Sequence, residues 1–327
     1  MKMSFAFIGN AGVEHALSEN LVAAGFPRSQ DVASADAVFV YCETQGALED
    51  AFFDTGGLVQ AAKKGAYLIT LCASTPTFAS ELAAVALVND LHPIEAPLVV
   101  NDVSLAQAFA DPANLSCLLA GEDGDLKAVR PLLAAIAATI EVTGKPGSAQ
   151  LAKAALTIQS MSQLVASVEM GALLKASSAD PQQAIGFAHA HGFITDAAYS
   201  LFAALSRESF EGRYTIELCM AELTAALMAA DDIDLILPAA EACMHLLELL
   251  ALIGGADLAP FALSLVYGEE DACAKQGLDW SRAKEAYAQG PDGDYGDDDY
   301  DDDDDDDRES GHNHDGFTGG FGSYSSN

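Results

Sequence analysis

The sequence predicts an α/β fold in which a shortened Rossmann-like N-terminal domain is followed by an all-helical domain and a disordered acidic tail. Short apolar runs alternate with longer amphipathic ones up to about residue 145, which is typical of strands and crossover helices. Apolar residues then recur at helical spacing, and an Asp-rich run closes the sequence. The predicted boundaries are residues 1–146, 147–290 and 291–327.

Six apolar runs are predicted to form a doubly wound, mostly parallel sheet. They cover residues 5–9, 37–42, 66–71, 94–96, 115–120 and 139–142. Amphipathic patterns over residues 13–24, 77–88 and 125–138 predict helices between them. Repetition of strand, helix and strand is typical of a Rossmann-like domain.

The second half of the chain carries only helical patterns. They cover residues 148–177, 182–190, 194–208, 214–230, 236–253 and 257–267. Their apolar content exceeds what one solvated face per helix requires, so we expect these helices to interlock in a homodimer.

The charge balance and the cysteines exclude several classes of protein. The chain has 49 acidic and 15 basic residues, a net charge of −34, which repels phosphate backbones and anionic lipid heads. We therefore expect no nucleic-acid partner and no membrane partner. No uncharged apolar run approaches the roughly 18 residues of a membrane helix. Six cysteines without CxxC or zinc-like spacing indicate reduced thiols, a cytoplasmic location and no metal site.

The acidic tail holds an unbroken run of aspartates from Asp301 to Asp307, followed by His312 and His314. Repulsion between like charges and the shortage of apolar side chains predict that it is disordered. Its carboxylates make cations or a basic partner the candidate ligands of this segment.

Several short landmarks follow one another in a fixed order along residues 4–267, and their joint order is more specific than any one of them. They are Phe7-Ile8-Gly9, Ala35-Asp36-Ala37-Val38, Lys64-Gly65-Ala66, Glu95-Ala96-Pro97 and Gly144-Lys145-Pro146-Gly147. In this order the sequence resembles the β-hydroxyacid dehydrogenase family, the group of 3-hydroxyisobutyrate dehydrogenase and its imine-reducing relatives.

The resemblance implies an NAD(P)H-dependent oxidoreductase that transfers a hydride to or from a small hydroxy or carbonyl compound. It places Lys153 at the family's acid/base position. A lysine suits that role because partial burial lowers its pKa towards neutrality. The implied cofactor-binding residues are Gly9, Asn10, Ala11, Gly12 and Thr75, and the implied substrate-binding residues are Pro97, Asn101 and Thr157.

The cofactor half of the family pattern is incomplete in this sequence. The G-x-G-x-x-G turn reads Gly9-Asn10-Ala11-Gly12-Val13-Glu14, so only its first glycine is in register. A Glu14 side chain facing a pyrophosphate 4 Å away would repel it by about 4 kcal/mol at an effective dielectric near 20. Residues 26–35 are too few for the next strand, helix and strand, so the adenosine side of the site is predicted to be missing. Asp31 and Arg28 are the candidates there for ribose and 2′-phosphate contacts.

The substrate half departs from the pattern as well. Leu98-Val99-Val100-Asn101 replaces the family's Ser-Gly-Gly, and Ala221-Glu222 replaces a Lys-Asp pair. Two hypotheses therefore stay open. The first is a hydride-transferring enzyme with Lys153 as acid/base. The second is a non-catalytic dimeric scaffold or binding protein that has lost the cofactor site.

Overall fold

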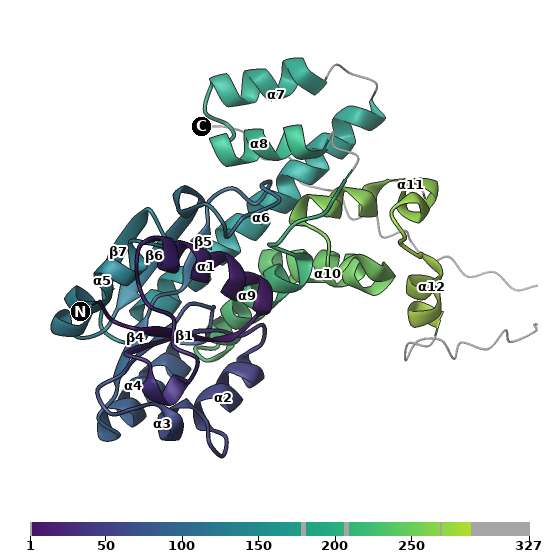
Figure 1. Cartoon of the computed structure of the whole chain (residues 1–327). Helices are drawn as coiled ribbons and strands as arrows, with labels where there is room; N and C mark the ends of the chain where they lie inside the picture. The colour runs from purple at the N-terminus through teal and green to yellow at the C-terminus, as the bar shows by residue number, and fades with distance from the viewer. Residues whose placement is uncertain (1, 178–180, 206–208, 269, 289–327) are drawn as a thin grey trace, which may run out of the picture. The chain divides into compact units, whose positions relative to one another are not determined.

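The computed structural model describes residues 2–177, 181–205, 209–268 and 270–288. The predicted acidic tail lies outside these residues. Residues 1–286 cluster as one compact unit in which a seven-stranded sheet is followed by helices (Figure 1). The predicted fold class, a Rossmann-like sheet followed by a helical region, is confirmed.

The sheet has the spatial order β1-β2-β3-β4-β6-β5, with β7 paired to β6. Its first four strands are mutually parallel, β6 and β7 are parallel, and β6 runs antiparallel to β4 and β5. The strands are β1 (Phe5–Gly9), β2 (Ala37–Tyr41), β3 (Tyr67–Thr70), β4 (His92–Glu95), β5 (Leu98–Val100), β6 (Leu115–Ala120) and β7 (Thr139–Gly144). The short β5 was not predicted, because three residues after a proline carry too little pattern to identify a strand.

Helices connect the strands; the first, fourth and fifth correspond to the predicted patterns, although the fifth ends before residue 138, and the second and third were not predicted. They are α1 (Ala11–Ala23), α2 (Gln45–Phe53), α3 (Leu58–Ala61), α4 (Pro76–Val88) and α5 (Asp123–Leu133). All five residues of β2 are buried, because this strand has neighbours on both sides and its side chains pack into the core on both faces.

One side of β1 has no full partner strand. Between α1 and β2 the described chain forms only a 3₁₀ turn (Val32–Ser34) and a single parallel bridge from Phe5 to Arg28. Phe5 donates its backbone N–H to Pro27 O at 3.0 Å, and Ser29 N–H donates to Phe5 O at 2.7 Å. The predicted loss of the second strand is therefore confirmed, and β1 ends the sheet.

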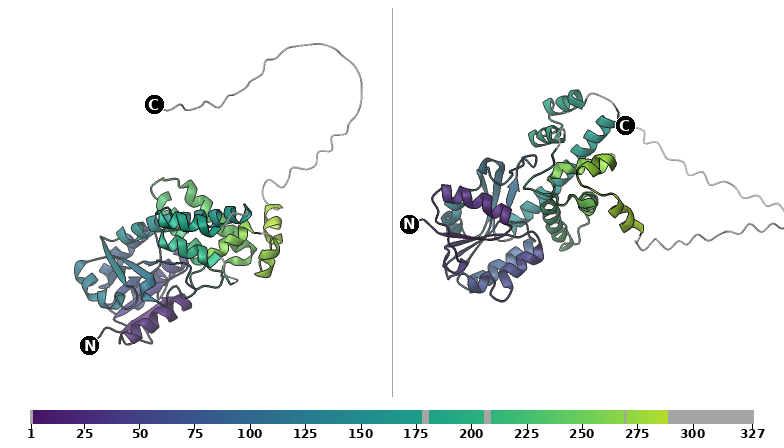
Figure 2. Two further views of the ribbon diagram at one scale, coloured as in Figure 1. Left: turned by 90° about the horizontal axis from the view of Figure 1, so that it is seen from above. Right: turned by 45° about the vertical axis from the view of Figure 1, so that its right-hand side comes forward.

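A 29-residue helix, α6 (Ser148–Ala176), joins the sheet to the helical half. It contacts β6 and β7 of the sheet and α8, α9 and α10 of the helical half (Figure 2). The other helical elements are α7 (Pro181–Ala190), α8 (Asp196–Leu205), α9 (Ile216–Asp231), α10 (Pro238–Leu250), a π turn (Ala251–Gly255), a 3₁₀ helix (Pro260–Tyr267), α11 (Glu270–Lys275) and α12 (Ser281–Ala288).

Only residues 238–255, among the described residues, are long and apolar enough for a membrane-spanning helix by length and composition alone. The segment contains Glu241 and Glu248, and α10 packs against α6 and α9. Its buried residues Ala240, Cys243, Met244, Leu247 and Leu250 repeat at helical spacing. The packing is that of a core helix with one covered face.

Candidate functional site

The turn between β1 and α1 keeps its first glycine for a steric reason. Gly9 has a φ of +116°, and a Cβ atom at this position would lie 1.9 Å from the Tyr41 carbonyl oxygen. Only glycine fits, because the neighbouring strand β2 passes so closely. The packing of β2 against this turn therefore requires a glycine at position 9, independently of any ligand.

The amino end of α1 is occupied by side chains of this chain. Asn10 Oδ1 accepts a hydrogen bond from Val13 N–H at 2.9 Å, and Asn10 Nδ2 donates to Glu43. Ala11 and Gly12 form the first residues of the helix. The Glu43 carboxylate thus lies beside the helix end at which a dinucleotide turn would hold a pyrophosphate.

Glu14 forms an ion pair with Arg28, which arrives on the segment that bridges to β1. The expected repulsion by an uncompensated Glu14 is therefore wrong in this structure, because a guanidinium neutralises the carboxylate. Arg28, a candidate for a 2′-phosphate, is engaged by that pair. Asp31, a candidate for ribose, accepts from Ala33 N–H at 2.9 Å and caps the 3₁₀ turn.

These residues do not fit a dinucleotide. The side of β1 on which adenosine would rest has a single bridged residue in place of a strand. Val13 N–H, one of the donors of the helix end, is capped by Asn10, and Glu43 adds a negative charge beside it. A pyrophosphate at this turn would displace the cap and meet a carboxylate.

Lys153 is buried on the second turn of α6 and paired with a carboxylate. Its Nζ atom lies 2.7 Å from Glu222 Oε2 on α9, and the two side chains are 5% and 9% exposed. Tyr214 donates its hydroxyl proton to the same oxygen at 2.8 Å. The resemblance implies that the Lys153 ammonium contacts a substrate oxygen. In this structure the Glu222 carboxylate binds that ammonium instead.

Thr157 lies one turn beyond Lys153 on α6 and is 2% exposed. Its Oγ1 atom is buried and has no hydrogen-bond partner among the described residues. A buried hydroxyl without a partner is costly, and Thr157 remains the least satisfied of the predicted substrate-binding residues.

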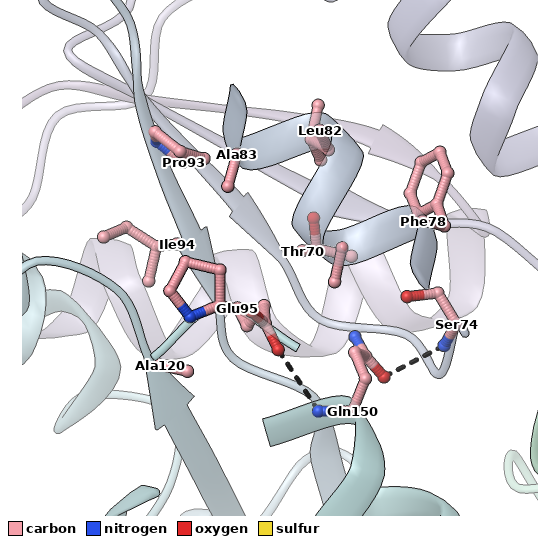
Figure 3. Close-up of a pocket in the computed structure, with 12 residues that line it drawn as sticks. Thr70, Ser74, Phe78, Leu82, Ala83, Pro93, Ile94, Glu95, Ala120 and Gln150 are labelled. Carbon is pink, nitrogen blue, oxygen red and sulfur yellow. Dashed lines mark hydrogen bonds between the residues drawn. The ribbon is translucent and has the colours of Figure 1, made fainter. Parts of the chain in front are cut away.

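A buried clamp holds the start of α6 against the sheet (Figure 3). Glu95, at the end of β4, accepts hydrogen bonds from Gly147 N–H at 2.5 Å and from Gln150 N–H at 3.2 Å. Gln150 Oε1 accepts from Ser74 N–H at 2.9 Å, and its Nε2 donates to the Cys72 carbonyl at 3.1 Å. Burial raises the pKa of Glu95, while the backbone donors of α6 act against that rise. The clamp fixes the helix turn that precedes Lys153.

A small cavity, with interior space for about one water molecule, opens where β2 and β3 end. We call it the carboxyl-edge cavity. Its lining comes from the ends of β2 and β3 and from α9: Tyr41, Cys42, Glu43, Thr44, Gln45, Cys72, Ala73, Leu218, Ala221 and Glu222. Burial raises the pKa of the Cys42 thiol to about 11 and that of Cys72 to about 12, so both thiols are protonated near neutral pH.

The remaining predicted residues lie elsewhere. Thr75 caps α4, and its Oγ1 atom accepts from Phe78 N–H at 3.1 Å. Pro97 joins β4 to β5. Asn101 lines a different, open cavity, together with Ser160, Gln163 and Ser167 of α6. Ser160 is seven residues beyond Lys153, roughly 10 Å along the helix, and Lys153 is not among the residues that line this cavity. A substrate site shared by Asn101 and Lys153 stays a prediction.

Sequence reasoning missed the residues that make this site distinctive. Tyr214 lies just before α9 in a segment with no recognisable motif, and Glu43 and Gln45 follow a strand like many loop residues. The sequence indicated Glu222 only as a departure from the Lys-Asp pair of the family that it resembles. The usable signal was polar residues directly after predicted parallel strands, which meet at one edge of a sheet.

Comparisons with known proteins agree with this architecture. Residues 6–144 match the family model of the NAD binding domain of 6-phosphogluconate dehydrogenase. YkwC, an uncharacterized oxidoreductase of Bacillus subtilis, is 25% identical over 151 residues, which are 46% of this chain and 51% of that protein. The 2-hydroxy-3-oxopropionate reductase of Escherichia coli is 24% identical over 233 residues, 70% of this chain and 77% of that protein.

Two solved structures show the same fold. The 3-hydroxyisobutyrate dehydrogenase of Mycobacterium tuberculosis, solved with L-serine, has a TM-score of 0.70 at 19% identity and covers 82% of this chain and 100% of its own. Psf3, in complex with NADP+ and 2-OPP, has a TM-score of 0.67 at 20% identity and covers 80% of this chain and 99% of its own.

The chain has the fold of the solved 3-hydroxyisobutyrate dehydrogenase, with an NAD-binding-type sheet followed by helices. Among known proteins the chain is similar to hydroxyacid dehydrogenases, in agreement with the resemblance to the β-hydroxyacid dehydrogenase family that the order of its sequence landmarks indicated. The alignment with the Bacillus subtilis relative spans only about half of that relative's length.

Proposed function

We propose that this chain is a non-catalytic descendant of the β-hydroxyacid dehydrogenases, a small-molecule-binding protein that keeps the fold and does not use a dinucleotide. The proposal rests mainly on Lys153, whose ammonium is already bound by a carboxylate of the chain. Lys153 is paired with Glu222 at 2.7 Å in a buried position, where a reactive site would leave it open to a substrate oxygen. The reduced adenosine side and the capped end of α1 support it independently.

Calorimetric titration of the full chain with NADH and with NADPH tests this function. Each 1.4 kcal/mol of lost contact weakens binding tenfold, so losing the adenosine platform moves a micromolar dissociation constant to millimolar or weaker. We expect no heat of binding for either nucleotide at micromolar concentrations. Low-micromolar binding of NADPH would overturn the proposal.

One observation favours hydride transfer as a second candidate. Lys153 is retained on α6, and its partner Glu222 lines the carboxyl-edge cavity between α9 and the ends of β2 and β3. If the chain is an enzyme, NADPH oxidation with small carbonyl compounds is lost in Lys153→Met and kept in Lys175→Met, a lysine in the last turn of the same helix. Absence of turnover in the wild-type chain favours the first candidate.

We also propose a homodimer in the cytoplasm. Several large apolar side chains of the helical half are exposed, among them Leu151 at 58% and Leu173 at 71% on α6. A second copy of the chain would cover such side chains. All six cysteines are free, which suits a reducing compartment.

A further inference from the structure

We infer that the cavity between α6 and α8 binds a small uncharged alcohol, a compound with a short apolar chain and one hydroxyl group. We call it the α6–α8 cavity; it is the cavity that Asn101 lines. The inference rests on the proposed function, because it assigns a ligand class to a protein that binds small molecules without a dinucleotide. Its support is the size of the cavity, its uncharged lining and one buried hydroxyl.

The α6–α8 cavity has room for a small molecule. Its interior has space for several water molecules, whereas the carboxyl-edge cavity has space for about one. Three parts of the chain enclose it: the residues that follow β5, the middle of α6 and the first half of α8. Because a water molecule in the liquid occupies about 30 Å³, this space suits a ligand of about five heavy atoms.

Most of the lining is apolar and none of it is charged. Met161 and Leu164 of α6 and Leu201 of α8 are 2%, 4% and 3% exposed, and Val100 and Val103 add to the apolar lining. No aspartate, glutamate, lysine, arginine or histidine is among the lining residues. An ionised ligand group would lose its water here without meeting a counter-charge, whereas burial of an alkyl chain is favourable.

One buried polar group faces this apolar space. Ser167 of α6 lines the cavity and is 5% exposed. Its Oγ atom forms no hydrogen bond with another described residue. Ser80 of α4, by contrast, donates to the Pro76 carbonyl of its own helix at 2.9 Å. A buried hydroxyl without a partner is costly, and a ligand hydroxyl can satisfy it because a hydroxyl both donates and accepts.

The other polar side chains of the lining already have contacts within the chain. Gln163 Nε2 donates to Thr195 Oγ1 at 2.9 Å, and Asn101 Oδ1 accepts from Ser116 Oγ at 2.9 Å. Both residues are less buried than Ser167, so water can reach their remaining polar atoms. The Ser167 hydroxyl is therefore the group of this cavity that gains most from a ligand.

Three probes with the same chain length and different charge test the inference. We would titrate the full chain with n-butanol, sodium butyrate and n-butylammonium chloride in physiological salt, following carbon-13-labelled methionine methyl groups by NMR. We expect n-butanol to bind in the millimolar range and at least tenfold more tightly than either ion. Equal or tighter binding of an ion, or no binding of n-butanol up to about 50 mM, would overturn the inference.

The methionine signals locate the bound alcohol. The Met161 side chain lines the cavity, so its methyl resonance should shift on titration with n-butanol. Met228, 41% exposed on α9 and outside the lining, should not shift. Equal shifts at the two residues would show that the alcohol adsorbs to exposed apolar surface, which contradicts a site at the cavity.

Variants test the hydroxyl and the space separately. Ser167→Ala is expected to weaken n-butanol binding several-fold, and Ser162→Ala, the same change on α6 outside the lining, should leave it unchanged. Ala197→Phe places a ring in the lining from an exposed position of α8 and should abolish binding while the circular dichroism spectrum stays native. Unchanged affinity in Ala197→Phe would place the alcohol elsewhere, and unchanged affinity in Ser167→Ala would remove its partner; either result defeats the inference.

The NADPH titration keeps this outcome apart from that of the proposed function. If neither NADPH nor n-butanol binds, the ligand class is wrong and the non-catalytic function stands. If NADPH binds at micromolar concentration, the proposed function fails whatever the alcohol does.

Discussion

Glu222 Oε2 receives two donors at once, the ammonium of Lys153 at 2.7 Å and the hydroxyl of Tyr214 at 2.8 Å. Both donors are buried, so neither can exchange its partner for water without opening the structure. The Glu222 carboxylate on α9 therefore determines which group the Lys153 ammonium on α6 contacts. The assignment of Lys153 from the sequence located the residue correctly on the long helix, and the contact with Glu222 decides what it can do.

Breaking this pair is expected to destabilise the chain strongly. Glu222→Leu leaves Lys153 buried without a counter-charge, which costs about 3–5 kcal/mol of unfolding free energy. The double variant Lys153→Met/Glu222→Leu removes both charges and should recover most of that loss. Urea unfolding of the wild-type chain, the single variants and the double variant measures the coupling.

The exposed pair Lys64–Asp90 is the matched control, because its side chains are 83% and 68% exposed at a separation of 2.8 Å. Removing Lys64 should change the unfolding free energy by less than about 1 kcal/mol. If Glu222→Leu lowered the unfolding free energy by no more than the Lys64 control does, water would have to reach the buried pair.

At the scale of elements, α6 depends on a residue from the sheet. Gly147 begins the helix with a φ of +90° and supplies no side-chain cap. Glu95 of β4 accepts the free N–H groups instead, and Gln150 binds the loop after β3. The position of Lys153 along the helix thus follows from a carboxylate that is distant in sequence.

Glu95→Ala should leave backbone donors of α6 unpaired in a buried place. We expect a loss of about 1–3 kcal/mol in unfolding free energy, together with faster hydrogen exchange at Gly147 and Gln150. Chemical unfolding and amide exchange measured by NMR are the two readouts. Glu122→Ala provides the control, since Glu122 precedes α5 without a side-chain cap and should cost less than about 0.5 kcal/mol. Unchanged exchange at α6 in the Glu95 variant would contradict the capping role.

At the scale of the whole molecule, the exposed apolar side chains of the helical half predict self-association. Light scattering after gel filtration should return about twice the 34.0 kDa mass of one chain. Leu173→Glu introduces a charge on α6 and should shift the mass towards the monomer. Val88→Glu, at the 85% exposed end of α4, is the control and should leave the mass unchanged. A monomeric wild-type chain at micromolar concentration would refute the dimer.

The sequence by itself determined most of the order of strands and helices, because apolar periodicity is local and survives strong divergence; the short elements β5, α2 and α3 carried too little pattern. The run Ala37–Tyr41 is buried at every position, and the helix from Ser148 ends within a residue of its predicted end. The missing second strand was also predictable, since too few residues lie between Gly25 and Asp36 to build it.

Only the tertiary structure decided what the site residues contact. The sequence predicts that Glu14 repels a pyrophosphate, but Arg28 forms an ion pair with it from a segment that bridges to β1. Lys153 reads as an open acid/base, but Glu222 closes it from another helix, while Asn101 lines a separate cavity. These pairings join residues that are distant along the chain. Periodicity places each residue on its own element, and the packing of one element against another sets its partner, its burial and its charge.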